Sequence, residues 1–256
     1  MGILNLTEDS FYDGGKHNSI SLALKQTEKM LKEGAFFIDV GAASSKPGSP
    51  IITADEEKKK LLPVLEKLIQ EYPSVHFSID TYNSSVAQAT LEMGASMIND
   101  ISGGQIDPQI RETTAHFKAP YIIMHMQGTP ETMQIQPHYE ALLQEVKLEL
   151  IQKVEKATAS GINDILIDPG FGFGKTIQHN FELLKNLALF TDLNCPILIG
   201  VSRKSMIYKV LKGSAATALN GTTALHAWAL ERGATVLRVH DVKEAKECID
   251  LWAALN

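Results

Sequence analysis

The sequence is poor in cysteine and has no long apolar run. Cys195 and Cys248 are its two cysteines, and their spacing fits neither a metal site nor a redox pair, so we expect reduced thiols and no disulfide framework. No apolar run approaches the roughly 20 residues that span a membrane. The start, MGILNLTEDSF, lacks the basic segment and the cleavage site of a secretion signal. We therefore expect a cytoplasmic protein without a membrane partner.

The sequence also lacks an excess of positive charge. Its 24 Lys and Arg residues are outnumbered by 30 Asp and Glu residues, which gives a net charge of −6. Binding to a nucleic-acid backbone needs clustered basic residues, and the one basic run, 58–60, directly follows the acidic run 55–57. We therefore expect no nucleic-acid partner. No Pro/Gly/Ser-rich linker divides the chain, so we predict a single domain over residues 1–256.

Short apolar segments that end at polar residues alternate with helical patterns. They predict strands at 2–5, 36–40, 76–80, 96–100, 121–125, 164–168, 197–202 and 235–240. One intervening helix is marked by a capping box, Thr53 with Glu56, and contains Pro63 as a potential kink. Strict alternation of buried strands with helices predicts an α/β protein with a parallel sheet, closed into a single (β/α)₈ TIM barrel. An open doubly wound sheet is the alternative.

Polar residues follow the predicted strands, and a barrel brings the C-terminal ends of its strands together at one mouth. In chain order these residues are Asn5, Ser44, Ser45, Lys46, Asp80, Asn99, Asp100, His125, Asp168, Ser202, Arg203, Lys204, Arg238 and His240. Because burying so many polar groups without partners costs free energy, we predict that a polar ligand binds at this mouth. The alternative is that each residue merely caps the next helix. For Asp100 we expect such a cap or a contact that orients Asn99.

Two kinds of chemistry are present among these residues. Lys46, Arg238 and His240 offer donors for an anion, and a helix that opens near Asp241 adds its N-terminal N–H groups, so we predict a phosphate site. A second set mixes acceptors with donors, as the edge of a nitrogen heterocycle requires: Asp80, Asn99, Asp168 and Lys204. In the segment DPGFGFGK the glycines allow a close approach of the backbone, and Phe173 can pack on a ring face.

Seven segments, taken in chain order, resemble the dihydropteroate synthase family. They are GILNLTEDSFYDGG, SIDTYNSSVA, MINDISGG, IIMHMQGTP, ILIDPGFGFGKT, ILIGVSRKSMI and VLRVHDV. The resemblance implies displacement of diphosphate from (7,8-dihydropterin-6-yl)methyl diphosphate by the amine of p-aminobenzoate, a step of folate synthesis. It also implies Mg²⁺ on the diphosphate, bound with the help of Asn5, and a homodimer. The apolar late region 215–232 is suited to such pairing.

The resemblance implies further roles for individual residues. Asp80, Asp168 and Lys204 would be catalytic. The pterin diphosphate would contact Ser45, Asp80, Asn99, Met124, Asp168, Phe173, Lys204, Arg238, Val239 and His240. The p-aminobenzoate pocket would be formed by Phe11, Ser45, Lys46, Pro47, Lys204 and Ser205.

The sequence departs from the family pattern in its first two strand-end loops. It reads SSKPG at 44–48 where Ser-Thr-Arg-Pro-Gly is usual, Ala43 where Glu is common, and Glu8 where Pro is usual. Because Lys lacks the planar fork of Arg, we hypothesise a looser anion or p-aminobenzoate clamp at Lys46. Unchanged Michaelis constants in a Lys46→Arg variant would exclude it. The first predicted strand lacks the segment that precedes it in many relatives, so we expect a less covered barrel bottom or a trimmed chain.

Three other functions stay open from the sequence. A pterin-binding methyltransferase domain shares the barrel, although Lys204 beside Ser205 suits arylamine coupling better; isotope-labelled methyl transfer would reveal it. An aldolase-like barrel would form a Schiff base at Lys204, which borohydride would trap. A non-catalytic pterin-binding barrel would bind its ligand without releasing diphosphate. We interpret His125 as structural or pocket-lining and Asp39 as a polar group inside the barrel.

Overall fold

The protein forms a closed barrel of eight parallel strands. The computed structural model describes residues 1–6, 16–43, 52–130, 132–133 and 135–256. The strands, each hydrogen-bonded to the next in chain order, are β1 (Gly2–Asn5), β2 (Phe37–Gly41), β3 (His76–Asp80), β4 (Met97–Asp100), β5 (Tyr121–Met124), β6 (Ile165–Asp168), β7 (Ile197–Ile199) and β8 (Ala234–Leu237). The Ile3 N–H donates to the Val239 carbonyl over 2.9 Å, which closes the sheet between β8 and β1. The predicted (β/α)₈ barrel is confirmed, and the open-sheet alternative is wrong.

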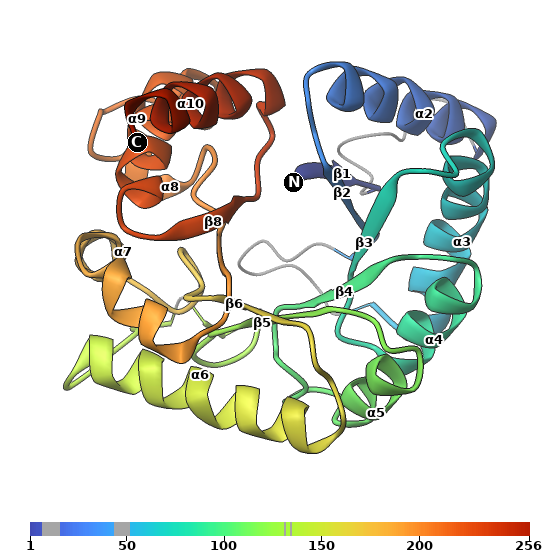
Figure 1. The fold of residues 1–256 in the computed structure, drawn as a ribbon, viewed down its shortest axis with the longest axis horizontal. Coiled ribbons are helices and arrows are strands. Elements are labelled where there is room, and N and C mark those ends of the chain that lie inside the picture. Colours follow the sequence, from blue (N-terminus) through green and yellow to red (C-terminus); the bar gives the residue numbers. More distant parts are fainter. Residues whose placement is uncertain (7–15, 44–51, 131, 134) are drawn as a thin grey trace.

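Helices alternate with the strands and form a ring outside them (Figure 1). They are α2 (Lys16–Lys32), α3 (Ala54–Glu71), α4 (Ser84–Glu92), α5 (Gln109–His116), α6 (Leu142–Ala159), α7 (Ile177–Lys185), α8 (Ser205–Tyr208), α9 (Leu219–Leu230) and α10 (Val242–Leu255), with 3₁₀ turns η1 (Leu187–Leu193) and η2 (Ala215–Thr217). In the described residues, none of these helices combines the length and apolar character that crossing a membrane requires. The main apolar core lies between the strands and this ring, where it includes Leu4, Ile38, Ile79 and Leu65.

The start of α3 shows how the sequence sets these boundaries. The Glu56 N–H donates to the Thr53 hydroxyl over 3.3 Å, and the Thr53 N–H donates to the Glu56 carboxylate over 2.9 Å, so the predicted capping box is present. The helix runs without interruption through Pro63. Strands β7 and β8 end earlier than predicted, at Ile199 and Leu237, because the polar residues beyond them lie in loops.

Candidate active site

The interior of the barrel is apolar at one level and polar at the next. Met97, Ile122 and Leu198 form a buried cluster with Phe37, Leu166 and Val236. Side chains alternate across a strand, so the residue two positions further along each strand also points inward, one level closer to the C-terminal mouth. Those residues are Asp39, Asn99, Met124, Asp168, Gly200 and Arg238. Strand pairing alone therefore gathers a polar layer above an apolar floor.

The guanidinium of Arg238 contacts two carboxylates, Asp39 and Asp80, and Asn99 contacts the first of them. Arg238 Nε donates to Asp39 Oδ2 over 2.6 Å, and Arg238 Nη2 donates to Asp80 Oδ2 over 2.7 Å. The amide of Asn99 donates to the same Asp39 oxygen over 3.0 Å. Although burial lowers the pKa of Arg238, the two carboxylates raise it above its ordinary value. The cation is thus permanent, and just beyond the end of β8 it is held by carboxylates of the neighbouring strands β2 and β3, on the other side of β1.

The surroundings of Asp80 shift the pKa of its carboxyl group. Burial raises its pKa to about 7, against the opposing charge of Arg238, while Asp39 raises it further. Its backbone lies between Gly41 and Asn99 in the strand register. A Cβ at Gly41 would come within 3.1 Å of Asp80 Cβ, so the glycine leaves room for this side chain. At neutral pH the group is therefore able both to carry and to lose a proton.

Asp168 and Lys204 meet the glycine-rich loop that follows β6. Asp168 Oδ1 accepts from the Gly170 N–H over 2.7 Å, and burial raises the pKa of this carboxyl while Lys204 lowers it. Lys204 Nζ donates to the Phe171 carbonyl and lies 4.6 Å from the centroid of the Phe173 ring. Burial lowers the pKa of Lys204 to about 8, although Asp168 raises it. A carboxylate, an ammonium and an aromatic face thus adjoin one another.

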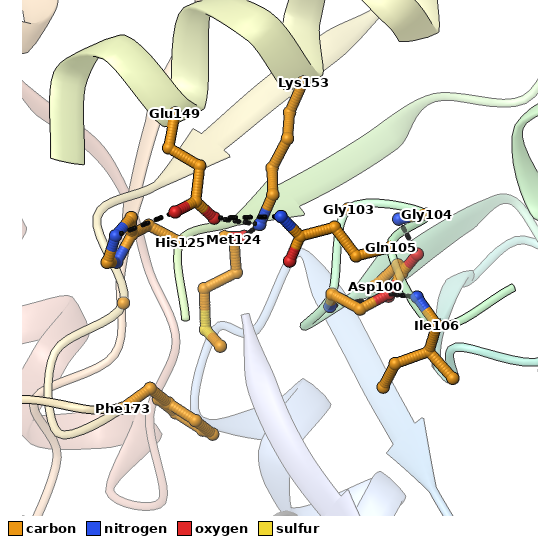
Figure 2. A network of polar contacts seen from close by, with 12 residues as sticks. Asp100, Gly103, Gly104, Gln105, Ile106, Met124, His125, Glu149, Lys153 and Phe173 are labelled. Carbon is orange, nitrogen blue, oxygen red and sulfur yellow. Dashed lines mark hydrogen bonds and ion pairs between the residues drawn. The ribbon is translucent and has the colours of Figure 1, made fainter. Parts of the chain in front are cut away.

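A second polar network lies behind this loop (Figure 2). Lys175 Nζ donates to His125 Nδ1 over 2.8 Å, and His125 Nε2 lies 3.3 Å from Glu149 Oε2. Glu149 also pairs with Lys153 at 2.8 Å, and Lys153 donates to the Met124 carbonyl over 2.7 Å. Both Glu149 and Lys153 reach inward from α6, as Figure 2 shows. The network ties α6 to the loops after β5 and β6.

Comparison with known proteins agrees with this geometry. Residues 1–240 match the family of pterin binding enzymes. This chain belongs to the pterin binding enzyme family. Among its relatives, the dihydropteroate synthase of Escherichia coli (strain K12) is 42% identical over 251 residues, covering 97% of this chain and 88% of that protein. The dihydropteroate synthase of Haemophilus influenzae is 40% identical over 256 residues, covering 99% and 92%.

Solved structures of family members have the same fold. The Yersinia pestis dihydropteroate synthase with a sulfonamide drug complex superposes with a TM-score of 0.93 at 40% identity, covering 100% of this chain and 93% of that one. The Xanthomonas albilineans dihydropteroate synthase with 4-aminobenzoic acid gives a TM-score of 0.93 at 35% identity, with 100% and 92% coverage. The enzyme from Clostridium difficile in the presence of pteroic acid gives 0.94 at 36% identity, with 100% and 95% coverage. The family resemblance read from the sequence is confirmed.

The structure brings most of the predicted pterin residues to one mouth, while their roles stay predictions. Asp80, Asn99 and Arg238 are joined through Asp39, and Lys204 joins the loop that carries Phe173. Other predicted residues lie close by in the fold: Met124 is the register partner of Asp168, Asn5 ends β1, Ser205 begins α8, and the His240 N–H donates to Ser202. The side chain of Val239 is buried in the core between strands and helices. Phe11, Ser45, Lys46 and Pro47 lie outside the described residues.

Two strand-end residues have partners that the sequence did not reveal. Asp100 accepts from the Ser102 and Gly104 N–H groups and from the Tyr121 hydroxyl. It therefore fixes the turn after β4, and the expected helix cap is wrong, because the next helix begins after Pro108; the orienting of Asn99 stays a prediction. Arg203 forms a two-pronged pair with Asp241, with both distances at 2.8 Å.

Sequence reasoning assigned no function to Lys175 or Glu149. The sequence placed Lys175 in a glycine-rich loop, which was the one indication of a role. Its acceptors are backbone carbonyls whose positions depend on the folded turns. From the sequence, Asp39 was only a polar residue within an apolar strand. Its buried contacts with Arg238 and Asn99 explain why a carboxylate occupies this position.

Proposed function

We propose that the protein catalyses the dihydropteroate synthase reaction, in which p-aminobenzoate displaces diphosphate from (7,8-dihydropterin-6-yl)methyl diphosphate. The observation that carries this proposal is the gathering of Asp80, Asn99, Asp168, Lys204 and Arg238 at one barrel mouth. The relatives named above support it, since two of them were solved with 4-aminobenzoic acid or pteroic acid. The protein is then a transferase of folate synthesis.

The pterin ring is bound by complementary hydrogen-bonding groups. One oxygen of Asp168 is held by Gly170, so the carboxylate is oriented to accept from the amino and ring N–H groups of a pterin. Asn99 donates through its amide nitrogen to Asp39, which leaves its carbonyl oxygen as an acceptor. Lys204 supplies a donor for the ring oxygen and nitrogen atoms, and Phe173 supplies a face for stacking.

The reaction breaks one C–O bond and forms one C–N bond. The electron pair of the C–O bond leaves with the diphosphate, and the positive charge left on the methylene carbon is spread over the pterin π-system and faced by Asp80. The amine of p-aminobenzoate then attacks this carbon and loses its proton to solvent or diphosphate. Arg238 and His240, with the first N–H groups of α10, bind the departing anion. Lys204 and Ser205 border the p-aminobenzoate pocket.

Mg²⁺ suits the residue that was assigned to it. Asn5 is half-buried at the C-terminal end of β1 and offers a carboxamide oxygen, the kind of hard ligand that Mg²⁺ accepts beside water and phosphate oxygens. When bound there, the ion would neutralise charge on the diphosphate. Loss of Mg²⁺-dependent turnover on chelation, with recovery on readdition, tests this assignment.

A diphosphate-release assay with both substrates and Mg²⁺ tests the proposed function. Release should require p-aminobenzoate, and dihydropteroate should accumulate in equal amount. Asp168→Asn and Lys204→Ala should each lose pterin binding while keeping native circular dichroism. Absence of diphosphate release by a folded parent that still binds pterin would instead indicate a non-catalytic binding barrel.

We also propose a homodimer and a cytoplasmic location. Large apolar side chains are exposed on the C-terminal part of the barrel, namely Val210, Leu211, Trp228, Leu251 and Leu255. Burying them against a second copy would remove apolar surface from water. Sedimentation equilibrium gives the mass directly, and a monomer at micromolar concentration would contradict the pairing. Cell fractionation tests the location.

A further inference from the structure

We propose that Lys175 is a positioning residue for pterin binding, which holds the loop between β6 and α7 in the shape that orients Asp168 and Lys204. The inference rests on the proposed function, because it assigns the pterin to that loop. Lys175 itself lies behind the loop, and its side chain does not belong to the set that faces the mouth.

The ammonium of Lys175 has an acceptor for each of its three N–H bonds. Its Nζ lies 3.0 Å from the Gly170 carbonyl, 3.0 Å from the Phe173 carbonyl and 2.8 Å from His125 Nδ1. The residue is 3% exposed, so water does not replace these partners. Burial lowers the pKa of Lys175 to about 7, while Asp168 and Glu149 raise it. A buried lysine whose three N–H groups all donate hydrogen bonds holds its acceptors in fixed positions.

The two carbonyls belong to residues on either side of Phe171. Gly170 donates its own N–H to Asp168 Oδ1 over 2.7 Å, so the position of Gly170 sets the orientation of the carboxylate. Phe171 presents the carbonyl that accepts from Lys204, and Phe173 presents the ring beneath the same ammonium. A change at Lys175 is therefore transmitted to Asp168 and Lys204 through one short stretch of backbone.

The glycines show how little freedom this backbone has. Gly170 has a φ of +75°, and a Cβ there would lie 1.8 Å from the His125 carbonyl oxygen. Gly174 has a φ of +61°, and a Cβ there would lie 2.7 Å from the Gln127 carbonyl oxygen. The loop is thus pressed against the segment after β5 at two points. Lys175 donates hydrogen bonds to both segments, since His125 lies in the segment after β5 and Gly170 lies in the loop after β6.

His125, which contacts Glu149 in Figure 2, also contacts the ammonium of Lys175. Because His125 Nδ1 accepts from Lys175, the ring proton lies on Nε2 and is donated to Glu149. Burial lowers the pKa of His125 to about 4, which keeps the ring neutral and able to accept. Burial raises the pKa of Glu149, but His125 and Lys153 outweigh it and bring the value to about 2. His125 is therefore neutral and Glu149 ionised at neutral pH.

The first test compares Lys175→Met with Lys147→Met. Methionine keeps the unbranched side chain as far as its fourth heavy atom but lacks the terminal ammonium, so it leaves the Gly170 and Phe173 carbonyls without this donor. Lys147 is a matched control, because it lies on α6 and pairs only at the surface with Asp192, at 2.8 Å. We expect Lys175→Met to bind 6-hydroxymethylpterin at least about tenfold more weakly, from two lost hydrogen bonds to buried carbonyls. Lys147→Met should bind as the parent does.

The Michaelis constants separate positioning from general weakening. In Lys175→Met, KM for the pterin diphosphate should rise by about tenfold. KM for p-aminobenzoate at saturating pterin should rise less, because of the two oriented groups only Lys204 borders that pocket. A folded Lys175→Met that binds pterin as the parent does would overturn the proposal, whatever its melting temperature. Equal increases in both constants would overturn it as well.

A second pair of variants decides the matter if Lys175→Met does not fold. Asn can place its Oδ1 near the position of His125 Nδ1, so His125→Asn retains an acceptor for Lys175, whereas His125→Leu removes it. We expect His125→Leu to weaken pterin binding by about fivefold and His125→Asn to restore most of it. Equal pterin affinity in the two variants would contradict the role of Lys175. A parent that binds no pterin would contradict the proposed function itself, which is a different result.

Discussion

Asp39 and Arg238 are 199 positions apart in the chain and meet at 2.6 Å inside the barrel. Their strands, β2 and β8, both flank β1, so the contact exists only because the sheet closes. Asp39 is fully buried, and its second oxygen has no hydrogen-bond partner among the described residues. The pair between Arg238 Nε and Asp39 fixes the guanidinium so that its terminal Nη2 reaches Asp80. The guanidinium that we propose as a ligand of the diphosphate is thereby held in one orientation.

Replacing Asp39 by Asn should destabilise the protein and loosen Arg238. Asn keeps the shape but removes the charge that faces the guanidinium, and breaking a buried pair costs about 3 kcal/mol of unfolding free energy. Urea denaturation at neutral pH measures this loss. The exposed pair of Lys246 and Asp250 provides the control, since Asp250→Asn should cost less than about 1 kcal/mol. Equal losses of unfolding free energy in the two variants would show that the buried Asp39 pair stabilises the protein no more than the exposed pair does.

The activity should depend on pH in two opposite ways near neutrality. Burial raises the pKa of Asp80 to about 7, so its carboxylate, which we propose to face the developing cation, forms as pH rises through 7. Burial lowers the pKa of Lys204 to about 8, so its ammonium is lost as pH rises further. The logarithm of kcat/KM for the pterin substrate should therefore be bell-shaped. Asp80→Asn should remove the acidic limb, and Lys204→Arg should leave an alkaline limb set by Lys175, whose pKa burial lowers to about 7; limbs unchanged in both variants would refute the assignment.

The same raised pKa at Asp80 has a calculable effect on stability. A carboxyl group whose folded pKa lies above its ordinary value of 3.8 favours the folded state when protonated. Its contribution is fully present below pH 3.8 and is lost as pH rises toward 7. Asp80→Asn should therefore gain stability relative to the parent between these limits, provided that Arg238 keeps its contact with Asp39. Unfolding free energies measured across this range give the difference directly.

The strand pattern was sufficient to predict the barrel and much of its mouth. Asp80, Asn99 and Asp168 end apolar segments, and parallel strands bring their C-terminal ends together whatever lies between them. The partner of Asp39 could not be predicted in this way, because the sequence does not say which of many distant cations will face a strand residue. Arg203 shows the converse: its position suggested a ligand, but Asp241 on the neighbouring loop binds it. Lys175 depends on left-handed glycines that place its acceptors.

The close packing of the loop after β6 predicts unequal effects for two alanine substitutions, Gly170→Ala and Gly161→Ala. Gly170 and Gly161 both have positive φ, at +75° and +95°, so alanine costs about 1 kcal/mol at either position from backbone strain. At Gly161 the nearest neighbour of a new Cβ is Ala115 Cβ at 3.8 Å, whereas at Gly170 it is the His125 carbonyl oxygen at 1.8 Å. Gly170→Ala should thus lose at least about 3 kcal/mol in urea denaturation. Similar losses of stability at the two positions would mean that the loop after β6 can move away from His125 at little cost in free energy.

His226 predicts a loss of stability in acid. It is 1% exposed on α9, and neither ring nitrogen has a hydrogen-bond partner among the described residues. Burial lowers its pKa from 6.5 to about 4, so folding favours the neutral ring. The stability contributed by this preference is fully present above pH 6.5 and is lost as pH falls toward 4, because the unfolded chain takes up the proton first.

The substitution His226→Phe isolates this effect, since it keeps a ring of similar size and cannot be protonated. Relative to its own value at neutral pH, the unfolding free energy of the parent should fall by about 2 kcal/mol more than that of the variant by about pH 4.5. Other titrating groups are shared by the two proteins, so their contributions cancel in the difference. Parallel curves for the parent and His226→Phe would mean that the buried ring is solvated or paired in solution.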